Sequence, residues 1–179
     1  MLDIEFAVLD FIQKYMTSPI MDKVMVFITS LGNSGGLWII LSILLICSKK
    51  YRTTGIMMAT GLILSLVVGN IILKPAFGRL RPFQIKEGVQ LLINAPRDFS
   101  FPSGHTLASA ISASILLFRE KKLGFWALII AILIAFSRLY LYVHFPTDVL
   151  GGAIFGVILG IISIKITESI IARNKGHIN

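Results

Sequence analysis

Long apolar runs separated by short polar segments dominate this sequence. Residues 55–73 carry no charged side chain and are followed at once by Lys74 and Pro75. Further apolar runs occupy residues 103–118, 123–143 and 148–165, and two shorter ones, 19–31 and 38–47, precede them. Because about 20 mostly apolar helical residues cross a bilayer, we predict an all-α polytopic membrane protein with six transmembrane helices.

The first residues have a different pattern. Apolar side chains recur at helical spacing and polar ones lie mostly opposite, which predicts an N-terminal interfacial amphipathic helix over residues 3–16. Ser18 followed by Pro19 is typical of a helix N-cap and first turn. The glycine-rich segment 32–36 predicts a turn between the first two spans.

Composition supports a membrane setting. The chain has 179 residues, 55% of them apolar and 15% charged, and a mean hydropathy of +0.84, which excludes an ordinary soluble protein. The net charge of +8 comes from basic residues scattered at the ends of apolar runs, so it favours membrane lipids and lipid phosphate over nucleic acid as partners. We find no repeat or linker and expect a single domain, 1–179.

The basic residues also predict an orientation. Segments 49–52 and 119–122 and the tail, with Arg173 and Lys175, are basic and share one side of a six-span path. By the positive-inside rule that side is cytoplasmic, and the N-terminus lies there too. The polar segments on the other side then face outward.

Three short motifs carry the chemistry. They run from Lys74 through Arg81-Pro82, over Pro102-Ser103-Gly104-His105, and from Ser137-Arg138 through His144 to Asp148. Each lies at the edge of an apolar run, so cations, two histidines and a carboxylate gather at one membrane face. Phosphate-ester cleavage without a metal requires fixed cations, a nucleophile and a proton donor.

Individual residues support this interpretation to different degrees. Arg138 follows fifteen uncharged residues, and an arginine within a span costs about 2.5–3.5 kcal/mol unless it is paired or hydrated. Lys74 alone is as well explained as a snorkelling anchor. His105 alone could be a polar residue behind a capped helix start, although such a start also favours a bound anion.

The third motif contains a predicted turn. Pro146 stands between His144 and Asp148, so one helix is not expected to contain both. We expect Asp148 to begin the last span and to accept a hydrogen bond from one imidazole nitrogen of His144, which leaves the other nitrogen free to attack.

Together the motifs resemble those of the type 2 phosphatidic acid phosphatase (PAP2) family, at every position and both internal spacings. The resemblance implies hydrolysis in two steps without metal or cofactor, and no obligatory protein partner. His144 would form a phosphohistidine, Asp148 would orient it, and His105 would protonate the leaving oxygen. The phosphate would be held by Lys74, Arg81, Ser103, Gly104 and Arg138.

Several alternatives remain open. Our first choice of substrate is undecaprenyl diphosphate, cleaved at the outer face of a bacterial cell membrane, with Arg79, Lys86 and Arg97 as head-group contacts. Phosphatidylglycerophosphate or phosphatidic acid is the alternative. A non-catalytic lipid-phosphate binder or flippase would use the same cations, and transfer to another acceptor would share the phosphoenzyme. Asp148 is the only acid that we place in the site.

Overall fold

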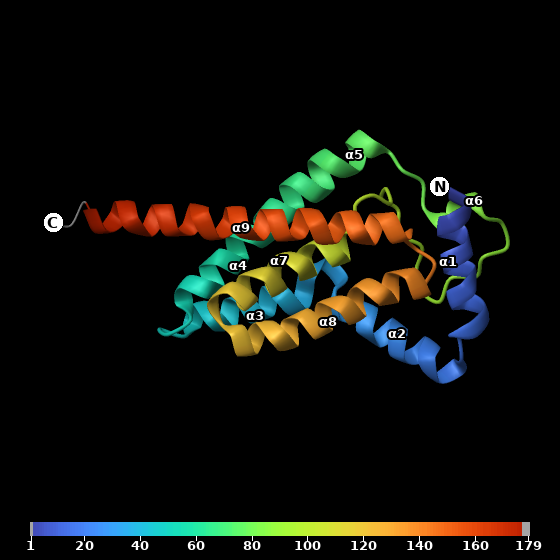
Figure 1. Ribbon diagram of the computed structural model, residues 1–179, viewed down its shortest axis with the longest axis horizontal. Coiled ribbons are helices and arrows are strands. Elements are labelled where there is room, and N and C mark those ends of the chain that lie inside the picture. The colour runs from blue at the N-terminus through green and yellow to red at the C-terminus, as the bar shows by residue number, and fades with distance from the viewer. Residues whose placement is uncertain (1, 177–179) are drawn as a thin grey trace.

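The computed structural model describes residues 2–176, and that part of the chain is helical without strands (Figure 1). The helices are α1 (Leu2–Tyr15), α2 (Pro19–Leu31), the 3₁₀ turn η1 (Asn33–Gly35), α3 (Gly36–Cys47), α4 (Arg52–Leu64), the π-helical η2 (Ser65–Leu73), α5 (Lys74–Phe77), α6 (Pro82–Ile85), α7 (Gly104–Arg119), α8 (Lys121–Tyr140) and α9 (Pro146–Gly176). Ser18 caps α2 and Pro19 opens it, as predicted.

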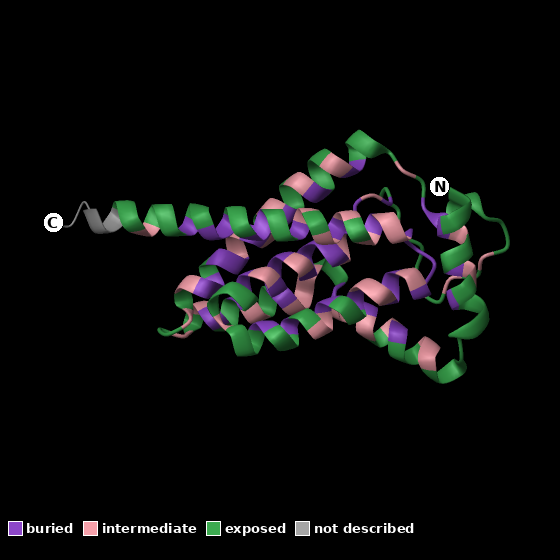
Figure 2. Ribbon diagram, in the orientation of Figure 1, coloured by how far each residue is buried: buried purple, intermediate pink, exposed green. Residues whose placement is uncertain are grey.

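Helix α7 is the centre of the bundle. It packs against both α8 and α9, and nine of its sixteen residues are buried. Figure 2 shows buried residues gathered where these helices face one another, while the far end of α9 is mostly exposed. Some polar side chains inside the bundle are paired, as where the indole Nε1 of Trp38 donates to Oγ of Ser109 at 2.9 Å. Such pairing satisfies groups that hydrocarbon cannot.

Three glycines on one face of α9 allow a close approach to α7. A Cβ atom on Gly156 would lie 2.8 Å from the carbonyl oxygen of Leu107, and one on Gly152 would lie 2.8 Å from that of Ser103. A Cβ atom on Gly160 would lie 2.2 Å from the side-chain oxygen of Ser114. This contact places the starts of the two helices side by side, and the backbone N–H of Ser103 donates to the carbonyl of Asp148 at 3.0 Å.

The six predicted spans are not confirmed. Within residues 2–176, three stretches are long and apolar enough to cross a membrane, namely Arg52–Ile85, Lys121–Tyr140 and Pro146–Arg173. A fourth is counted if α2 and α3 form one span with a 45° bend. Ser34 and Gly35 adopt positive φ angles of 51° and 70° in η1. The chain therefore bends by 45° at residues 32–36, where the glycine-rich pattern predicted a turn between two spans.

This bend changes the topology. Helix α1 crosses the end of the bundle where α8 stops and α9 starts, and the C-terminal end of α9 lies at the opposite end (Figure 1). Glu5 of α1 pairs with Arg79, between Lys74 and Arg81, so α1 lies at the same end of the bundle as the motifs and not opposite them as predicted. The side of the membrane on which this end lies stays a prediction. The basic segments 49–52 and 119–122 lie at the end away from α1, as Figure 1 shows. The side chain of Lys175 and residues 177–179 lie outside the described part of the chain.

Candidate active site

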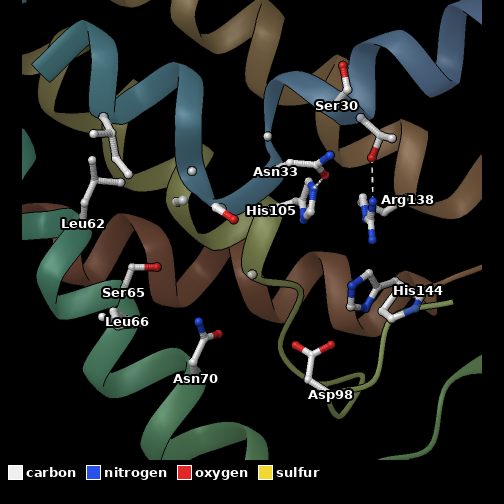
Figure 3. A pocket seen from close by; sticks show the side chains of 18 of the residues that line it. Ser30, Asn33, Leu62, Ser65, Leu66, Asn70, Asp98, His105, Arg138 and His144 are labelled. Carbon is white, nitrogen blue, oxygen red and sulfur yellow. Dashed lines mark hydrogen bonds between the residues drawn. The ribbon is translucent and has the colours of Figure 1, made fainter. Parts of the chain in front are cut away.

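A cavity of about 1220 Å³ brings the three motifs together. One end is polar and is lined by five motif side chains: Lys74, Arg81, His105, Arg138 and His144. The other end runs between α3 and α4 with η2, where apolar side chains such as Ile39, Ile43, Leu62 and Leu66 line it (Figure 3). The cavity therefore suits a molecule with an anionic head and an apolar tail.

His144 lies at the polar end and is held from both sides. Nη1 of Arg81 lies 3.1 Å from Nε2 of His144, while Oδ2 of Asp148 lies 3.5 Å from Nδ1. A guanidinium can only donate, so Nε2 must accept and the imidazole proton sits on Nδ1, toward Asp148. Burial, and then the charges of Arg81, Arg138 and Lys74, hold the pKa of His144 well below its usual value.

Asp148 lies in the first turn of α9, so the predicted break between His144 and Asp148 is present, although the helix begins at Pro146 and not at Asp148. Its carboxylate is fully buried and accepts three hydrogen bonds besides facing His144. Oδ2 accepts from the Ser100 hydroxyl at 2.5 Å and from the Phe145 backbone N–H at 2.8 Å, and Oδ1 accepts from Arg79 at 2.6 Å. The carboxylate is therefore fixed in one orientation.

Lys74 and Arg81 are both buried and both pair with Asp98. Nη2 of Arg81 donates to Oδ1 of Asp98 at 2.7 Å, and Nζ of Lys74 donates to Oδ2. Burial raises the pKa of Asp98, but the hydrogen bonds and charges of Lys74 and Arg81 outweigh it and hold that pKa at about 2. Asp98 lines the cavity, so the expectation that Asp148 is the only acid in the site is wrong.

Arg138 supplies a third buried cation. Its Nη1 donates to Oγ1 of Thr29 at 2.5 Å, a contact visible in Figure 3. Its Nε is buried and has no hydrogen-bond partner among the described residues. A buried donor without a partner is costly, and a phosphate oxygen in the cavity would satisfy it.

The second motif contributes unequally. His105 projects into the cavity, and its Nε2 lies 3.0 Å from Oδ1 of Asn33 in η1 (Figure 3). Gly104 lines the cavity, and a Cβ atom there would lie 3.8 Å from Nζ of Lys74. Ser103 is fully buried and caps α7, receiving hydrogen bonds from Thr106, and it does not line the cavity.

The three further cations lie elsewhere. Arg79 pairs with Glu5 and Asp148, on the side of Asp148 away from the cavity, and Lys86 pairs with Asp10 of α1 at 2.7 Å. Neither lines the cavity. Arg97 lines an adjoining hollow with Gln84 and Asn94. The structure therefore does not bring Arg79 and Lys86 to the position expected for head-group contacts, because carboxylates of α1 and α9 hold them.

Sequence reasoning missed several residues of the site. Glu5, Asn33, Asp98 and Ser100 contact motif residues through long-range hydrogen bonds. Their sequence positions carry no spacing signal, because the contacts cross segments far apart in the chain. The glycines at 152, 156 and 160 do carry one, since small residues at every fourth position are typical of close helix packing in membranes.

Comparison with known proteins assigns the family. The sequence matches the PAP2 superfamily over residues 54–171, which include all three motifs. The chain belongs to the PAP2 superfamily. Helices α1, α2 and α3 precede the matched region of this PAP2 protein.

Relatives of this PAP2 protein cover most of its length. An undecaprenyl-diphosphatase of Sulfolobus acidocaldarius is 33% identical over 150 residues, covering 83% of this chain and 72% of that protein. Phosphatidylglycerophosphatase B of Bacillus subtilis is 36% identical over 157 residues, covering 79% and 72%. The crystal structure of Aquifex aeolicus LpxE superposes with a TM-score of 0.76 at 32% identity, covering 92% of this chain and 94% of that one.

Proposed function

We propose that this PAP2 protein hydrolyses a lipid phosphate or diphosphate through a phosphohistidine at His144. The observation that carries the proposal is the place of His144: its Nε2 lies 3.1 Å from Nη1 of Arg81, at a cavity lined by Lys74, Arg81 and Arg138. An Nε2 that accepts from Arg81 is unprotonated and able to attack phosphorus. A relative named as an undecaprenyl-diphosphatase and another named as a phosphatidylglycerophosphatase support the same class of enzyme.

In the first step Nε2 of His144 attacks phosphorus and the bond to the leaving oxygen breaks. His105, fixed by Asn33, gives its proton to that oxygen. Asp148 faces the Nδ1–H of His144 and stabilises the positive charge that develops on the ring. The three cations stabilise the charge on the equatorial oxygens, which is the main requirement of phosphoryl transfer.

In the second step a water molecule attacks the phosphohistidine. His105, now neutral, takes the water proton, the P–N bond breaks, and inorganic phosphate leaves His144 ready for another turnover. The same phosphoenzyme would serve a transferase, and the acceptor alone distinguishes the two activities.

Protein side chains supply the positive charge in this scheme, so we propose a reaction that needs no metal. Mg²⁺ sites usually use one or two carboxylates together with substrate phosphates, whereas Asp98 and Asp148 already hold arginine and lysine partners. Activity is expected to survive a chelator, and vanadate should inhibit by mimicking five-coordinate phosphorus. Loss of activity on chelation that Mg²⁺ or Mn²⁺ restores would contradict this part.

Trapping the intermediate tests the mechanism. Wild type incubated with a ³²P-labelled lipid phosphate should yield an acid-labile phosphoenzyme on a denaturing gel, and His144→Ala should yield none and release no phosphate. Purified wild type that binds lipid phosphate but releases no phosphate would favour the binder or flippase. Turnover by His144→Ala at the wild-type rate would exclude His144 as the nucleophile.

For the substrate we propose an isoprenoid diphosphate such as undecaprenyl diphosphate, with phosphatidylglycerophosphate as the second candidate. The bundle end away from the site carries basic segments 49–52 and 119–122, which favours a cytoplasmic location for that end and an outward-facing site. In a bacterial membrane, α1 would then lie at the outer surface. Arg97, in the hollow beside the cavity, is the remaining cation for a second phosphate.

The substrate assignment is tested by comparing kcat/KM for the two lipids in wild type and Arg97→Ala. We expect a preference for the diphosphate that Arg97→Ala selectively reduces. Lys86→Ala is the matched control, because Lys86 lies on the same loop but pairs with Asp10. A preference for phosphatidylglycerophosphate that is unchanged in Arg97→Ala would reverse the assignment and leave the mechanism intact.

A further inference from the structure

A line of alternating charges extends from His144 away from the cavity. Asp148 lies behind His144, and Nη1 of Arg79 donates to Oδ1 of Asp148 at 2.6 Å. Arg79 is the guanidinium that compensates this fully buried carboxylate. A buried carboxylate is costly without such a partner, and losing one member of a buried pair is more damaging than losing an exposed one.

Arg79 is in turn held by the N-terminal helix. Its Nη2 donates to Oε2 of Glu5 at 2.5 Å, its guanidinium lies 4.3 Å from the ring centre of Phe145, and Nη1 also donates to Thr147 at 2.6 Å. The other oxygen of Glu5 accepts from the hydroxyl and the backbone N–H of Thr147. The side-chain partners of the Arg79 guanidinium are therefore Glu5 of α1 and two residues of the segment that carries His144 and Asp148.

Glu5 differs from the other acids of α1. It is 4% exposed, whereas Asp3 is exposed and Asp10 is partly exposed. A glutamate on an amphipathic helix would ordinarily face water. Its burial against Arg79 costs desolvation, which the ion pair and the Thr147 contacts offset.

We propose that Glu5 and Arg79 are positioning residues for the His144–Asp148 pair, so that α1 forms part of the catalytic apparatus. Arg79 fixes Oδ1 of Asp148, which holds Oδ2 toward Nδ1 of His144, and Glu5 fixes Arg79. This inference rests on the proposed function, because it assigns a rate effect to residues that do not touch the substrate.

The chain offers a matched control for the attachment of α1. Lys86 also ties α1 to the rest of the protein, since its Nζ donates to both oxygens of Asp10 at 2.7 Å. Neither residue contacts Asp148 or lines the cavity. Removal of this pair therefore measures how a looser attachment of α1, by itself, changes kcat and KM.

The experiment compares full-length Arg79→Gln, Glu5→Gln, Lys86→Gln and the Glu5→Gln/Arg79→Gln double variant in one detergent–lipid mixture. Arg79→Gln should lower kcat about ten- to a hundredfold, as loss of residues that orient a catalytic group commonly does, and leave KM nearly unchanged. Glu5→Gln, which is isosteric, should lower kcat less. The double variant should resemble Arg79→Gln alone, because the two residues act in one chain of contacts. Lys86→Gln should stay within about twofold of wild type, as expected for an exposed pair.

Other outcomes overturn the inference. Equal losses in Arg79→Gln and Lys86→Gln would show that α1 acts by docking alone. A raised KM at constant kcat in Arg79→Gln would make Arg79 a substrate contact. Wild-type kcat in a folded Glu5→Gln, judged by its thermal unfolding, would remove Glu5 from the apparatus. Absence of phosphate release by wild type would overturn the proposed function and this inference with it, whereas the first three results leave the proposed function standing.

Discussion

Nη1 of Arg81, from the first motif, lies 3.1 Å from Nε2 of His144, from the third motif. The guanidinium lies beside the nitrogen whose lone pair would attack phosphorus, and it donates a hydrogen bond to that lone pair. When a phosphate enters, its oxygens can take over the Arg81 donors and bring phosphorus to the nitrogen that Arg81 had kept unprotonated. We therefore expect Arg81 both to set the protonation state of His144 and to form part of the phosphate site.

The first prediction concerns the titration of His144. Because burial and the charges of Arg81, Arg138 and Lys74 lower its pKa, the ring should stay neutral where a free imidazole, with a pKa of about 6.5, becomes protonated. ¹⁵N spectra of histidine-labelled protein, with His144→Gln to identify the signal, should show this ring becoming protonated only at a lower pH than a free imidazole. Arg81→Gln should raise the pKa, because it removes a nearby cation. Titration of wild-type His144 near pH 6.5 would contradict the geometry.

A second prediction concerns Asp98, whose carboxylate occupies donors of Lys74 and Arg81 that a phosphate would need. Asp98→Asn removes this competing charge. Inhibition by vanadate or inorganic phosphate should tighten about two- to fivefold, the range expected for a partly exposed ion pair. Inhibition constants measured at pH 7 check this prediction. The control is Asp10→Asn, because Asp10 pairs with Lys86 outside the cavity. Weaker inhibition in Asp98→Asn would show instead that Asp98 holds the two cations in place.

The third prediction separates the proton donor from the nucleophile. His105→Ala should slow cleavage of a lipid phosphate about a hundredfold or more, the usual contribution of a positioned general acid. It should slow p-nitrophenyl phosphate much less, because that leaving group departs without a proton. Asn33→Ala should show a smaller loss with the same substrate dependence, since Asn33 contacts Nε2 of His105. Equal losses on both substrates would argue against His105 as the acid.

The fourth prediction concerns the glycine contact between α7 and α9. A methyl group on Gly156 would lie 2.6 Å from Cβ of Ala110 and 2.8 Å from the Leu107 carbonyl, so one helix must move. Gly156→Ala should lower the free energy of unfolding by about 1–3 kcal/mol, as overpacking commonly does. Thermal unfolding in detergent measures this. Gly36→Ala is the control, because a methyl group there has open space around it, and equal losses in both would contradict the packing argument.

Local patterns predicted much of the site and of the fold. The Ser18-Pro19 helix start and the turn before Asp148 depend on neighbouring residues, and both are present. Two kinds of feature escaped. The 32–36 segment has turn chemistry that fits either a reversal or a bend, and its close contact with His105, 73 residues after Gly32, has no signal in the sequence. The pairing of Arg79 with Glu5 could not be predicted from the sequence either, because the two residues lie 74 positions apart.

The cavity joins two surroundings, and this decides how reactants travel. Its apolar end lies between α3 and α4 with η2, among side chains such as Ile43 and Ile63 that are also exposed on the outer surface of the bundle. A lipid can therefore enter and leave sideways while its tail stays in the bilayer, and inorganic phosphate departs toward water from the polar end. A hydrocarbon chain longer than the groove would simply continue among the lipids. We therefore expect the cavity to select substrates by their head groups and the first few carbons of their tails, and not by the total length of the hydrocarbon tail.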